Sequence, residues 1–257
     1  MRNVLITVEY DGKNFSGWQF QPELRTVQGV LEEALSKFTG TEIQISGTSR
    51  TDAGVHALGQ CASFRGDFSI PLDNLKRAVN NYLAGGMNAI QPIGDVRIVD
   101  IKEMPLDFHA RFDCIGKTYR YVICNAKEMP VYRKDYCYLV KHPLDIELMK
   151  AGASYILGTH DFKCFQAAGS QPRETTVRTI KALTIEKVGD DIVLEVTGDG
   201  FLYNMVRIIV GTLVDVGHGK KTPLEVKSII ESLDRNNAGH TAPACGLYLK
   251  EIYFKEN

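Results

Sequence analysis

The feature that most constrains the fold of this 257-residue chain is a strand-and-helix rhythm that occurs twice. Residues 4–10 alternate between two faces with the period of a strand, and Asp11-Gly12 ends the run. A helix pattern follows, with Thr26 as its expected N-cap and Gly40 just beyond its end. The apolar residues of this helix recur at helical spacing: Val27, Val30, Leu31, Ala34, Leu35 and Phe38.

The remaining elements follow the same signals. The first half predicts strands at residues 42–46, 60–65 and 96–103, and a helix over 72–83 that Gly85-Gly86 stops. The second half predicts a strand, a helix, a hairpin, two more helices and a closing strand. Their expected ranges are 117–125, 145–157, 177–187 with 192–197, 203–216, a helix opened by Thr222-Pro223, and 246–254.

Strands interleaved with helices in two comparable halves indicate an α+β fold built as a duplication of ferredoxin-like units. The length suits two domains of about 100–150 residues better than one core. We place the boundary at Met104-Pro105, which gives an N-terminal half over residues 1–104 and a C-terminal half over 105–257.

Composition describes an ordinary globular protein, with 44% hydrophobic and 24% charged residues. No stretch approaches the roughly 20 apolar residues of a membrane span, and the start leads directly into a strand pattern rather than a signal peptide. The six cysteines are scattered without a Cys-x-x-Cys pair, which favours neither a zinc site nor a disulfide framework. We therefore expect a cytoplasmic protein.

The net charge of −1 is not typical of a nucleic-acid-binding protein, but the charge is unevenly distributed along the chain. Between His109 and His142, seven basic residues stand against Asp113, Glu128 and Asp135, a net of +4. A local patch of this kind suits a phosphate footprint, or simply a solvated face. The basic residues are Arg111, Lys117, Arg120, Lys127, Arg133, Lys134 and Lys141.

The segment with the strongest functional signal is the polar decapeptide from Gly47 to His56, Gly-Thr-Ser-Arg-Thr-Asp-Ala-Gly-Val-His. It has no apolar periodicity, so it predicts a loop, and loops on a scaffold commonly carry chemistry. Arg50, Asp52 and His56 are its reactive side chains. The plainer alternative is a solvated turn in which Arg50 pairs with Asp52.

This decapeptide resembles the catalytic loop of the TruA family of tRNA pseudouridine synthases, in which the Asp of the Arg-Thr-Asp triplet is essential. The resemblance covers essentially the whole chain. Its other blocks are Glu9-Tyr10-Asp11-Gly12, Phe15-Ser16-Gly17-Trp18-Gln19, His109-Ala110-Arg111-Phe112, Lys117-Thr118-Tyr119-Arg120-Tyr121, Gly158-Thr159-His160-Asp161-Phe162, Gly200-Phe201-Leu202-Tyr203-Asn204-Met205-Val206-Arg207 and Ala242-Pro243-Ala244-Cys245-Gly246-Leu247.

The resemblance implies two ferredoxin-like (RRM-like) halves joined in a continuous, mainly antiparallel sheet, flanked by helices, with a central active-site cleft. It implies an isomerase that converts uridine to pseudouridine at positions 38, 39 and 40 of the tRNA anticodon stem-loop. The expected partners are tRNA and a second copy of the chain, without cofactor, metal or membrane.

The resemblance also implies roles for individual residues. Asp52 is the catalytic carboxylate, and attack on C6, attack on C1′ and removal of the C2′ proton all stay open. Arg50 helps to displace the target base, and Arg207 is a second cation on Asp52. Tyr119 stacks on the flipped base and transfers a proton. Leu247 lines the pocket, and His56 orders the loop or contacts phosphate.

Two other functions compete with the isomerase. A non-catalytic RNA-binding module of RRM-like fold would carry a Lys/Arg-Gly-Phe strand motif, which the chain lacks. An Asp-dependent hydrolase would need a partner carboxylate or His at a convincing spacing. On spacing alone, Tyr119 is by default a core residue. Leu247 is equally consistent with a core residue, Arg207 with a structural ion pair and His56 with a satisfied polar residue. The isomerase is the hypothesis that the resemblance favours.

Overall fold

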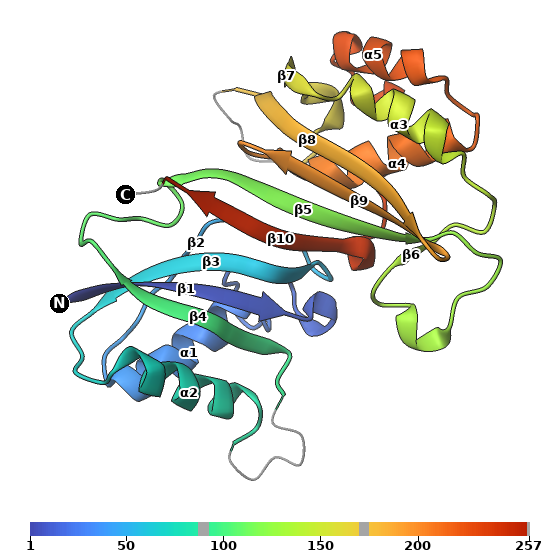
Figure 1. The fold of residues 1–257 in the computed structure, drawn as a ribbon. Coiled ribbons are helices and arrows are strands. Elements are labelled where there is room, and N and C mark those ends of the chain that lie inside the picture. Colours follow the sequence, from blue (N-terminus) through green and yellow to red (C-terminus); the bar gives the residue numbers. More distant parts are fainter. Residues whose placement is uncertain (87–92, 170–174, 256–257) are drawn as a thin grey trace. The chain divides into compact units, whose positions relative to one another are not determined.

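A computed structural model of the chain describes residues 1–86, 93–169 and 175–255 (Figure 1). The chain divides into two compact units. Unit 1 comprises Met1–Ile115 with Leu249–Asn257, and unit 2 comprises Gly116–Tyr248. Each unit is a mainly antiparallel sheet with its own helices.

Unit 1 is built on four strands in the order β4 (Val96–Met104), β1 (Arg2–Tyr10), β3 (His56–Gly66) and β10 (Leu247–Phe254), of which the first two residues belong to unit 2. The two-residue strand β2 (Ser46–Gly47) also pairs with β3. Strand β1 runs antiparallel to both of its neighbours, so that Ile6 lies between Ala62 and Ile101. Helices α1 (Val27–Thr39) and α2 (Leu72–Leu83) cover one face of this sheet (Figure 1).

Helix α1 begins and ends where the sequence predicts. The Thr26 side chain accepts a hydrogen bond from the Gly29 N–H, and Gly40 closes the helix in the left-handed conformation at φ 72°. Val27, Leu31 and Leu35 are fully buried. The predicted apolar stripe is therefore the face that α1 buries.

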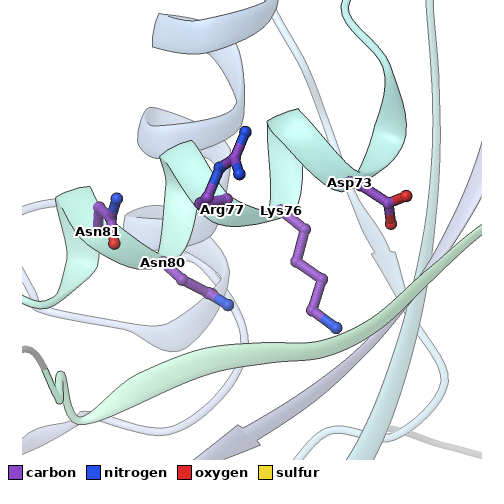
Figure 2. Close-up of a pocket in the computed structure, with 5 residues that line it drawn as sticks. All are labelled: Asp73, Lys76, Arg77, Asn80 and Asn81. Atoms are coloured by element: carbon purple, nitrogen blue, oxygen red, sulfur yellow. The ribbon is translucent and has the colours of Figure 1, made fainter.

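The outer edge of β4 is occupied by side chains of α2. The Asn80 amide donates to the Ile98 carbonyl at 2.9 Å and accepts from the Ile98 N–H at 2.8 Å. The Lys76 side chain donates to the Val99 carbonyl. The side chains of Lys76 and Asn80 also line a surface pocket on α2 (Figure 2). These contacts satisfy backbone groups that an edge strand would otherwise offer to another chain.

Unit 2 places β5 (Cys114–Cys124), β9 (Asp191–Gly198), β8 (Val177–Val188) and β7 (Gly158–Asp161) in that order, with β6 (Tyr138–Leu139) parallel to the end of β5. Helix α3 (Ile146–Ser154) packs against α4 (Met205–Gly217), α5 (Pro223–Ser232) and β8. The described residues also include five short 3-10 helices: η1 (Gly12–Asn14), η2 (Val131–Arg133), η3 (Lys163–Phe165), η4 (Arg235–Asn237) and η5 (Ala244–Gly246).

The two units share a ferredoxin-like strand order. In unit 1 the elements β1, α1, β2, β3, α2 and β4 give the spatial order β4-β1-β3-β2. In unit 2, β5, α3, β8, β9 and α4 follow the same rhythm, with β5-β9-β8 corresponding to β1-β3-β2. The predicted α+β class, with mainly antiparallel strands flanked by helices, is confirmed.

Several element boundaries differ from the sequence-based expectation: β3 begins at His56 instead of residue 60, and β5 begins at Cys114 instead of residue 117. The predicted strand over 42–46 is reduced to Ser46–Gly47. The predicted helix over 145–157 starts after Asp145, which caps it through two backbone N–H groups, and ends at Ser154. Helix α4 starts at Met205 instead of 203, because Asn204 adopts the left-handed conformation at φ 58°.

The division between the units falls after Ile115, eleven residues beyond the predicted boundary at Met104-Pro105. Residues after β4 stay attached to unit 1, because the Asn3 amide donates to the carbonyls of Pro105 and Phe108 at 2.7 and 2.8 Å. Residues 1–104 and 105–257 as the two halves, one continuous sheet and a central cleft stay predictions.

Candidate active site

The Gly47–His56 decapeptide is a loop that joins β2 to β3, as predicted. Within it, Thr48, Ser49 and Thr51 are 7%, 6% and 7% exposed, whereas Arg50 is exposed and Asp52 is half-buried. The Val55 N–H donates to the Asp52 carbonyl at 3.2 Å, which closes a tight turn. The loop thus buries its threonines and serine and turns directly after Asp52.

Thr51 is held by residues from β1 and the segment that follows it. The Trp18 N–H donates to the Thr51 carbonyl at 3.0 Å, and the Tyr10 hydroxyl lies 2.7 Å from Thr51 Oγ1. Gly17 adopts φ 94°, and a Cβ there would lie 2.8 Å from the Thr51 carbonyl oxygen. This close approach requires glycine and fixes the backbone immediately before Asp52.

The start of the loop is anchored on β3. The Thr48 hydroxyl donates to the Cys61 carbonyl at 2.9 Å. The fully buried Gln60 amide accepts from the Ser49 N–H at 3.3 Å and donates to the Ser49 carbonyl at 2.6 Å. Polar residues can be buried here because each has a partner.

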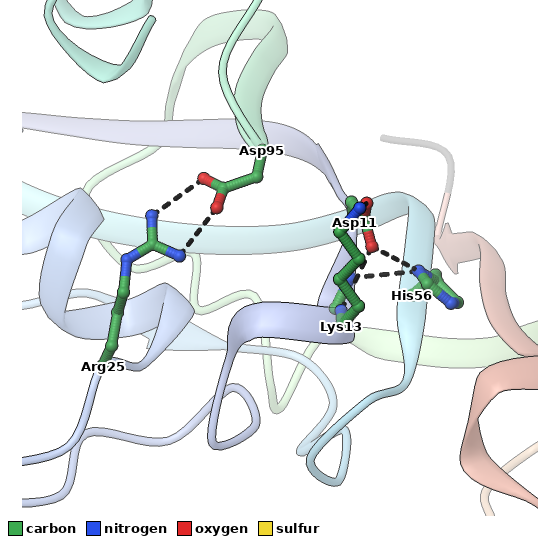
Figure 3. A network of polar contacts seen from close by, with 6 residues as sticks. Asp11, Lys13, Arg25, His56 and Asp95 are labelled. Carbon is green, nitrogen blue, oxygen red and sulfur yellow. Dashed lines mark hydrogen bonds and ion pairs between the residues drawn. The ribbon is translucent and has the colours of Figure 1, made fainter. Parts of the chain in front are cut away.

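His56 is 2% exposed and lies at the end of the loop (Figure 3). Its Nδ1 accepts from the Gly12 N–H at 3.0 Å and lies 3.3 Å from Asp11 Oδ1. The geometry favours the loop-ordering role for His56 over a phosphate contact.

Arg50 forms no ion pair with the residues that the structure describes, so the solvated turn with an Arg50–Asp52 pair is wrong. The guanidinium is exposed, and exposed pairs gain too little Coulomb energy to hold two side chains together. It is available to a ligand on the outside of unit 1.

In unit 2, Tyr119 lies on β5 opposite Val196 of β9 and is 8% exposed. Its ring contacts Phe201 edge-on, with centroids 5.2 Å apart. Phe201 comes shortly before α4, so this contact joins β5 to the start of that helix. Tyr121, two residues further along β5, is fully buried.

Arg207 is the third residue of α4 and is half-buried. Its Nε donates to the Ala242 carbonyl at 2.6 Å, and its Nη1 donates to Asn204 Oδ1 at 2.8 Å. A cation is unfavourable in the first turn of a helix, where the dipole favours anions. Two hydrogen bonds therefore fix a guanidinium at a place that helix stability alone would not select.

Leu247, 6% exposed, starts β10 directly after the 242–246 segment. Tyr121 holds this segment: its hydroxyl donates to the Pro243 carbonyl at 2.7 Å, and a Cβ on Gly246 would lie 2.7 Å from its ring. Burial raises the pKa of the Tyr121 hydroxyl, so it stays a donor. Tyr119, Arg207 and Leu247 thus all belong to unit 2, on β5, on α4 and at the start of β10.

Two cations of the basic 109–142 stretch are neutralised by β9. Arg120 pairs with Glu195 at 2.8 Å and Arg133 pairs with Asp191 at 2.7 Å. The stretch is therefore less positive as a surface than its net charge of +4 predicts. Arg111, Lys127, Lys134 and Lys141 are its exposed basic residues.

Sequence reasoning missed the residues that hold the predicted ones. Tyr10, Trp18 and Gln60 support the Asp52 loop, and Tyr121 and Asn204 support the unit 2 residues. Tyr10 and Trp18 belong to blocks that carry the family resemblance, which is the signal that could have identified them. Nothing in the sequence pattern marks Gln60.

Other kinds of site receive no support from the described residues. None of the groups of His, Cys, Asp and Glu in that part of the chain is arranged to hold a metal ion. None of its helices is long and apolar enough to cross a membrane. The pocket on α2 is lined by Asp73, Lys76, Arg77, Asn80 and Asn81, and by none of the predicted site residues.

Comparison with known proteins identifies the family to which the chain is similar. The family model described as tRNA pseudouridine synthase matches residues 6–113 and 153–255, ranges that contain Arg50, Asp52, His56, Arg207 and Leu247. Tyr119 lies between the two ranges.

The similarity to curated proteins extends over the full length. The chain is 49% identical to tRNA pseudouridine synthase A of Thermoanaerobacter sp. (strain X514) over 99% of this chain and 100% of that protein. It is 47% identical to tRNA pseudouridine synthase A of Acetivibrio thermocellus, again over 99% and 100%. A chain of a Cbf5-Nop10-Gar1 complex overlaps weakly, with a TM-score of 0.34 and 12% identity over 82% of this chain and 54% of that one. The chain therefore belongs to the tRNA pseudouridine synthase family, isomerases that convert uridine to pseudouridine.

Proposed function

We propose that the chain isomerises uridines 38, 39 and 40 in the anticodon stem-loop of tRNA, with Asp52 as the catalytic carboxylate. The observation that carries the proposal is the loop geometry: Thr51 is clamped by Tyr10 and Trp18, and the backbone turns directly after Asp52. A clamped neighbour holds a catalytic group in position before the substrate arrives.

The reaction is internally balanced. The N1–C1′ bond of the uridine breaks, a C5–C1′ bond forms, the C5 proton leaves and N1 gains a proton. An ionised Asp52 supplies the group that adds to an electrophilic carbon or removes a sugar proton. Kinetic measurements can distinguish attack of Asp52 on C6, attack on C1′ and removal of the C2′ proton.

Arg50, Tyr119, Arg207 and Leu247 complete the proposed site. A base within a stem must leave the stack before a carboxylate reaches its sugar, which costs a few kcal/mol. The exposed Arg50 is suited to displace the base, and the Tyr119 ring is suited to stack on it. We propose that Arg207 keeps Asp52 ionised, since a nearby cation lowers the pKa of a carboxyl group, and that Leu247 lines the pocket.

The partner that we propose is the anticodon arm of tRNA, bound by a homodimer in the cytoplasm. Recognition would rest on RNA shape and phosphate contacts, which can serve several adjacent uridines with one site. The exposed cations Lys127, Lys134 and Lys141 are suited to phosphate contacts.

The test is to incubate the purified protein with unmodified tRNA transcripts and to map pseudouridine at single-nucleotide resolution. We expect modification at positions 38 to 40 and none in transcripts that carry cytidine there. A non-catalytic RNA-binding module would bind the same transcripts and leave every uridine intact. Modification confined to another arm would contradict the proposed positions while leaving the family unchanged.

A further inference from the structure

Between β4 and β5, residues 109–113 (His-Ala-Arg-Phe-Asp) form a compact turn, which we name the aromatic turn. The Phe112 and Asp113 N–H groups both donate to the His109 carbonyl at 3.0 Å. The His109 N–H donates to Asp113 Oδ2 at 2.7 Å, and the Arg111 N–H donates to His109 Nδ1 at 3.2 Å. Four internal hydrogen bonds hold this short segment in one conformation.

The turn presents an aromatic ring and a cation on its outside. The Phe112 side chain is 75% exposed, and its ring lies 4.4 Å from the His109 ring, centroid to centroid. The exposed Arg111 guanidinium lies 5.8 Å from the Phe112 centroid and forms no ion pair within the described part of the chain. A scattered apolar residue on a surface is ordinary, but a preorganised ring with an unpaired cation is a stacking platform for a nucleobase.

The aromatic turn is fixed to the Asp52 loop. Ala110 at its centre is fully buried, its N–H donates to Ser63 Oγ at 3.0 Å, and its carbonyl accepts from the Thr48 hydroxyl at 3.3 Å. Two residues span at most about 7 Å. Arg50 therefore lies within that reach of Thr48, and Phe112 within the same reach of Ala110. The aromatic turn and the Asp52 loop are therefore attached to each other within unit 1, through Ala110 and Thr48.

We propose that the aromatic turn is a binding site for the substrate RNA, in which Phe112 stacks on an unpaired nucleobase beside the target uridine and Arg111 contacts a neighbouring phosphate. This inference rests on the proposed function. The occupant is argued from the attachment to the Asp52 loop and from the chemistry, since a π-face next to a cation suits nucleic acid. The one carboxylate in the turn, Asp113, is engaged by the His109 N–H.

The experiment measures tRNA binding by Phe112→Ala, Phe112→Tyr and Arg111→Ala over a range of salt concentrations. Stacking contributes about 1–3 kcal/mol per base, so we expect Phe112→Ala to weaken binding about 5- to 150-fold. Phe112→Tyr should bind like wild type, because it keeps the ring. Arg111→Ala should make the log–log salt slope less steep by about 0.7–0.9, whereas Phe112→Ala should leave the slope unchanged.

A matched control is Tyr155→Ala, which removes another exposed aromatic side chain, at the end of α3, and should leave affinity unchanged. At saturating tRNA, kcat of Phe112→Ala should stay within about threefold of wild type while KM rises, as for loss of binding alone. Sedimentation and thermal melting of each variant test whether a change in affinity comes from altered assembly or folding of the protein.

Two results would overturn the inference. Wild-type affinity and slope in both Phe112→Ala and Arg111→Ala would show that RNA does not touch the turn. A change of oligomeric state in Phe112→Ala would assign the ring to a contact between copies of the chain. Failure of the proposed function looks different: the wild-type protein would bind tRNA, with or without help from Phe112, and would form no pseudouridine at positions 38 to 40.

Discussion

The Tyr10 hydroxyl lies 2.7 Å from Oγ1 of Thr51, the residue that directly precedes Asp52. Tyr10 ends β1 and is 5% exposed, so this bond connects the sheet of unit 1 to the loop through a rigid, buried side chain. The only tryptophan of the chain, Trp18, is 2% exposed and donates its backbone N–H to the Thr51 carbonyl. Thr51 is thus held through both its side chain and its backbone.

Removing this bond should slow catalysis without weakening RNA binding. Tyr10→Phe and Thr51→Val each delete one partner, and a small displacement of a reacting group can cost up to about 100-fold in rate. We expect kcat to fall between about tenfold and 100-fold with KM unchanged, and the double variant to be no slower than the singles, because both changes break one interaction.

Thr51→Ser keeps the hydroxyl and should restore kcat to within a few-fold of wild type. Tyr82→Phe is the matched control, since its hydroxyl donates to Glu33 at 2.6 Å on the surface of the helices. Trp18 fluorescence should shift in Tyr10→Phe but not in Tyr82→Phe. Equal kcat in Tyr10→Phe and wild type would show that Thr51 needs only its backbone contact.

Gly17 offers a second way to displace the loop. An alanine there would have a strained φ near 94° and a Cβ 2.8 Å from the Thr51 carbonyl oxygen. Gly40→Ala is the control, because φ is 72° but nothing lies within 4 Å of its Cβ. Both should lose about 1–2 kcal/mol of unfolding free energy from left-handed strain, and Gly17→Ala should lose more and also lose kcat. Urea unfolding and turnover that fail to separate the two variants would refute the close-approach argument.

Asn204 holds Arg207 through a hydrogen bond of 2.8 Å and occupies a left-handed position that glycine tolerates. Asn204→Gly should therefore preserve the start of α4 while releasing one guanidinium contact. We expect unchanged thermal stability to within a few degrees and a lower kcat, measured as pseudouridine formed at saturating tRNA. Leu233→Gly relieves a φ of 56° at the end of α5 and should raise stability without changing kcat.

Buried thiols predict how stability depends on alkaline pH. Burial raises the pKa of Cys61 and Cys137 to about 11 and that of Cys164 to about 12. An exposed thiol titrates near 8.5, so above that pH the unfolded chain loses protons that the folded chain keeps. The unfolding free energy should be insensitive to these groups below about pH 8.5 and should fall as the pH rises toward 11.

Urea unfolding at several alkaline pH values measures this decline, and Cys61→Ala should make it shallower because one raised thiol is removed. A thiol reagent at about pH 8 should react slowly with these three cysteines in the folded protein and rapidly after unfolding. A decline of equal steepness in Cys61→Ala would assign the effect to other groups.

The local signals in the sequence identify most elements, because they act over a few residues. Thr26 and Gly40 bound α1, and Thr222 forms the capping box that opens α5. The limits of local reasoning are visible at Asn204, where a left-handed residue delays α4 by two positions.

The Asp52 loop shows what cannot be read locally. A polar decapeptide predicts an exposed loop, yet Ser49 and His56 are buried. Their partners, Gln60 and Gly12, come from elsewhere in the chain, and only the folded sheet brings them together. Similarly, the sequence alone counts Arg120 among the cations of the basic stretch, whereas in the folded protein it pairs with Glu195 of β9.

The most direct measurement is turnover and binding of Asp52→Asn on unmodified tRNA transcripts. The amide replaces the carboxylate with little change in volume, so the loop contacts of Thr51 should persist. We predict tRNA affinity within a few-fold of wild type and no pseudouridine above background, even with enzyme in excess over RNA. Pseudouridine formed by Asp52→Asn, in protein shown by mass spectrometry to be free of the wild-type residue, would contradict the assignment of Asp52 as the catalytic carboxylate.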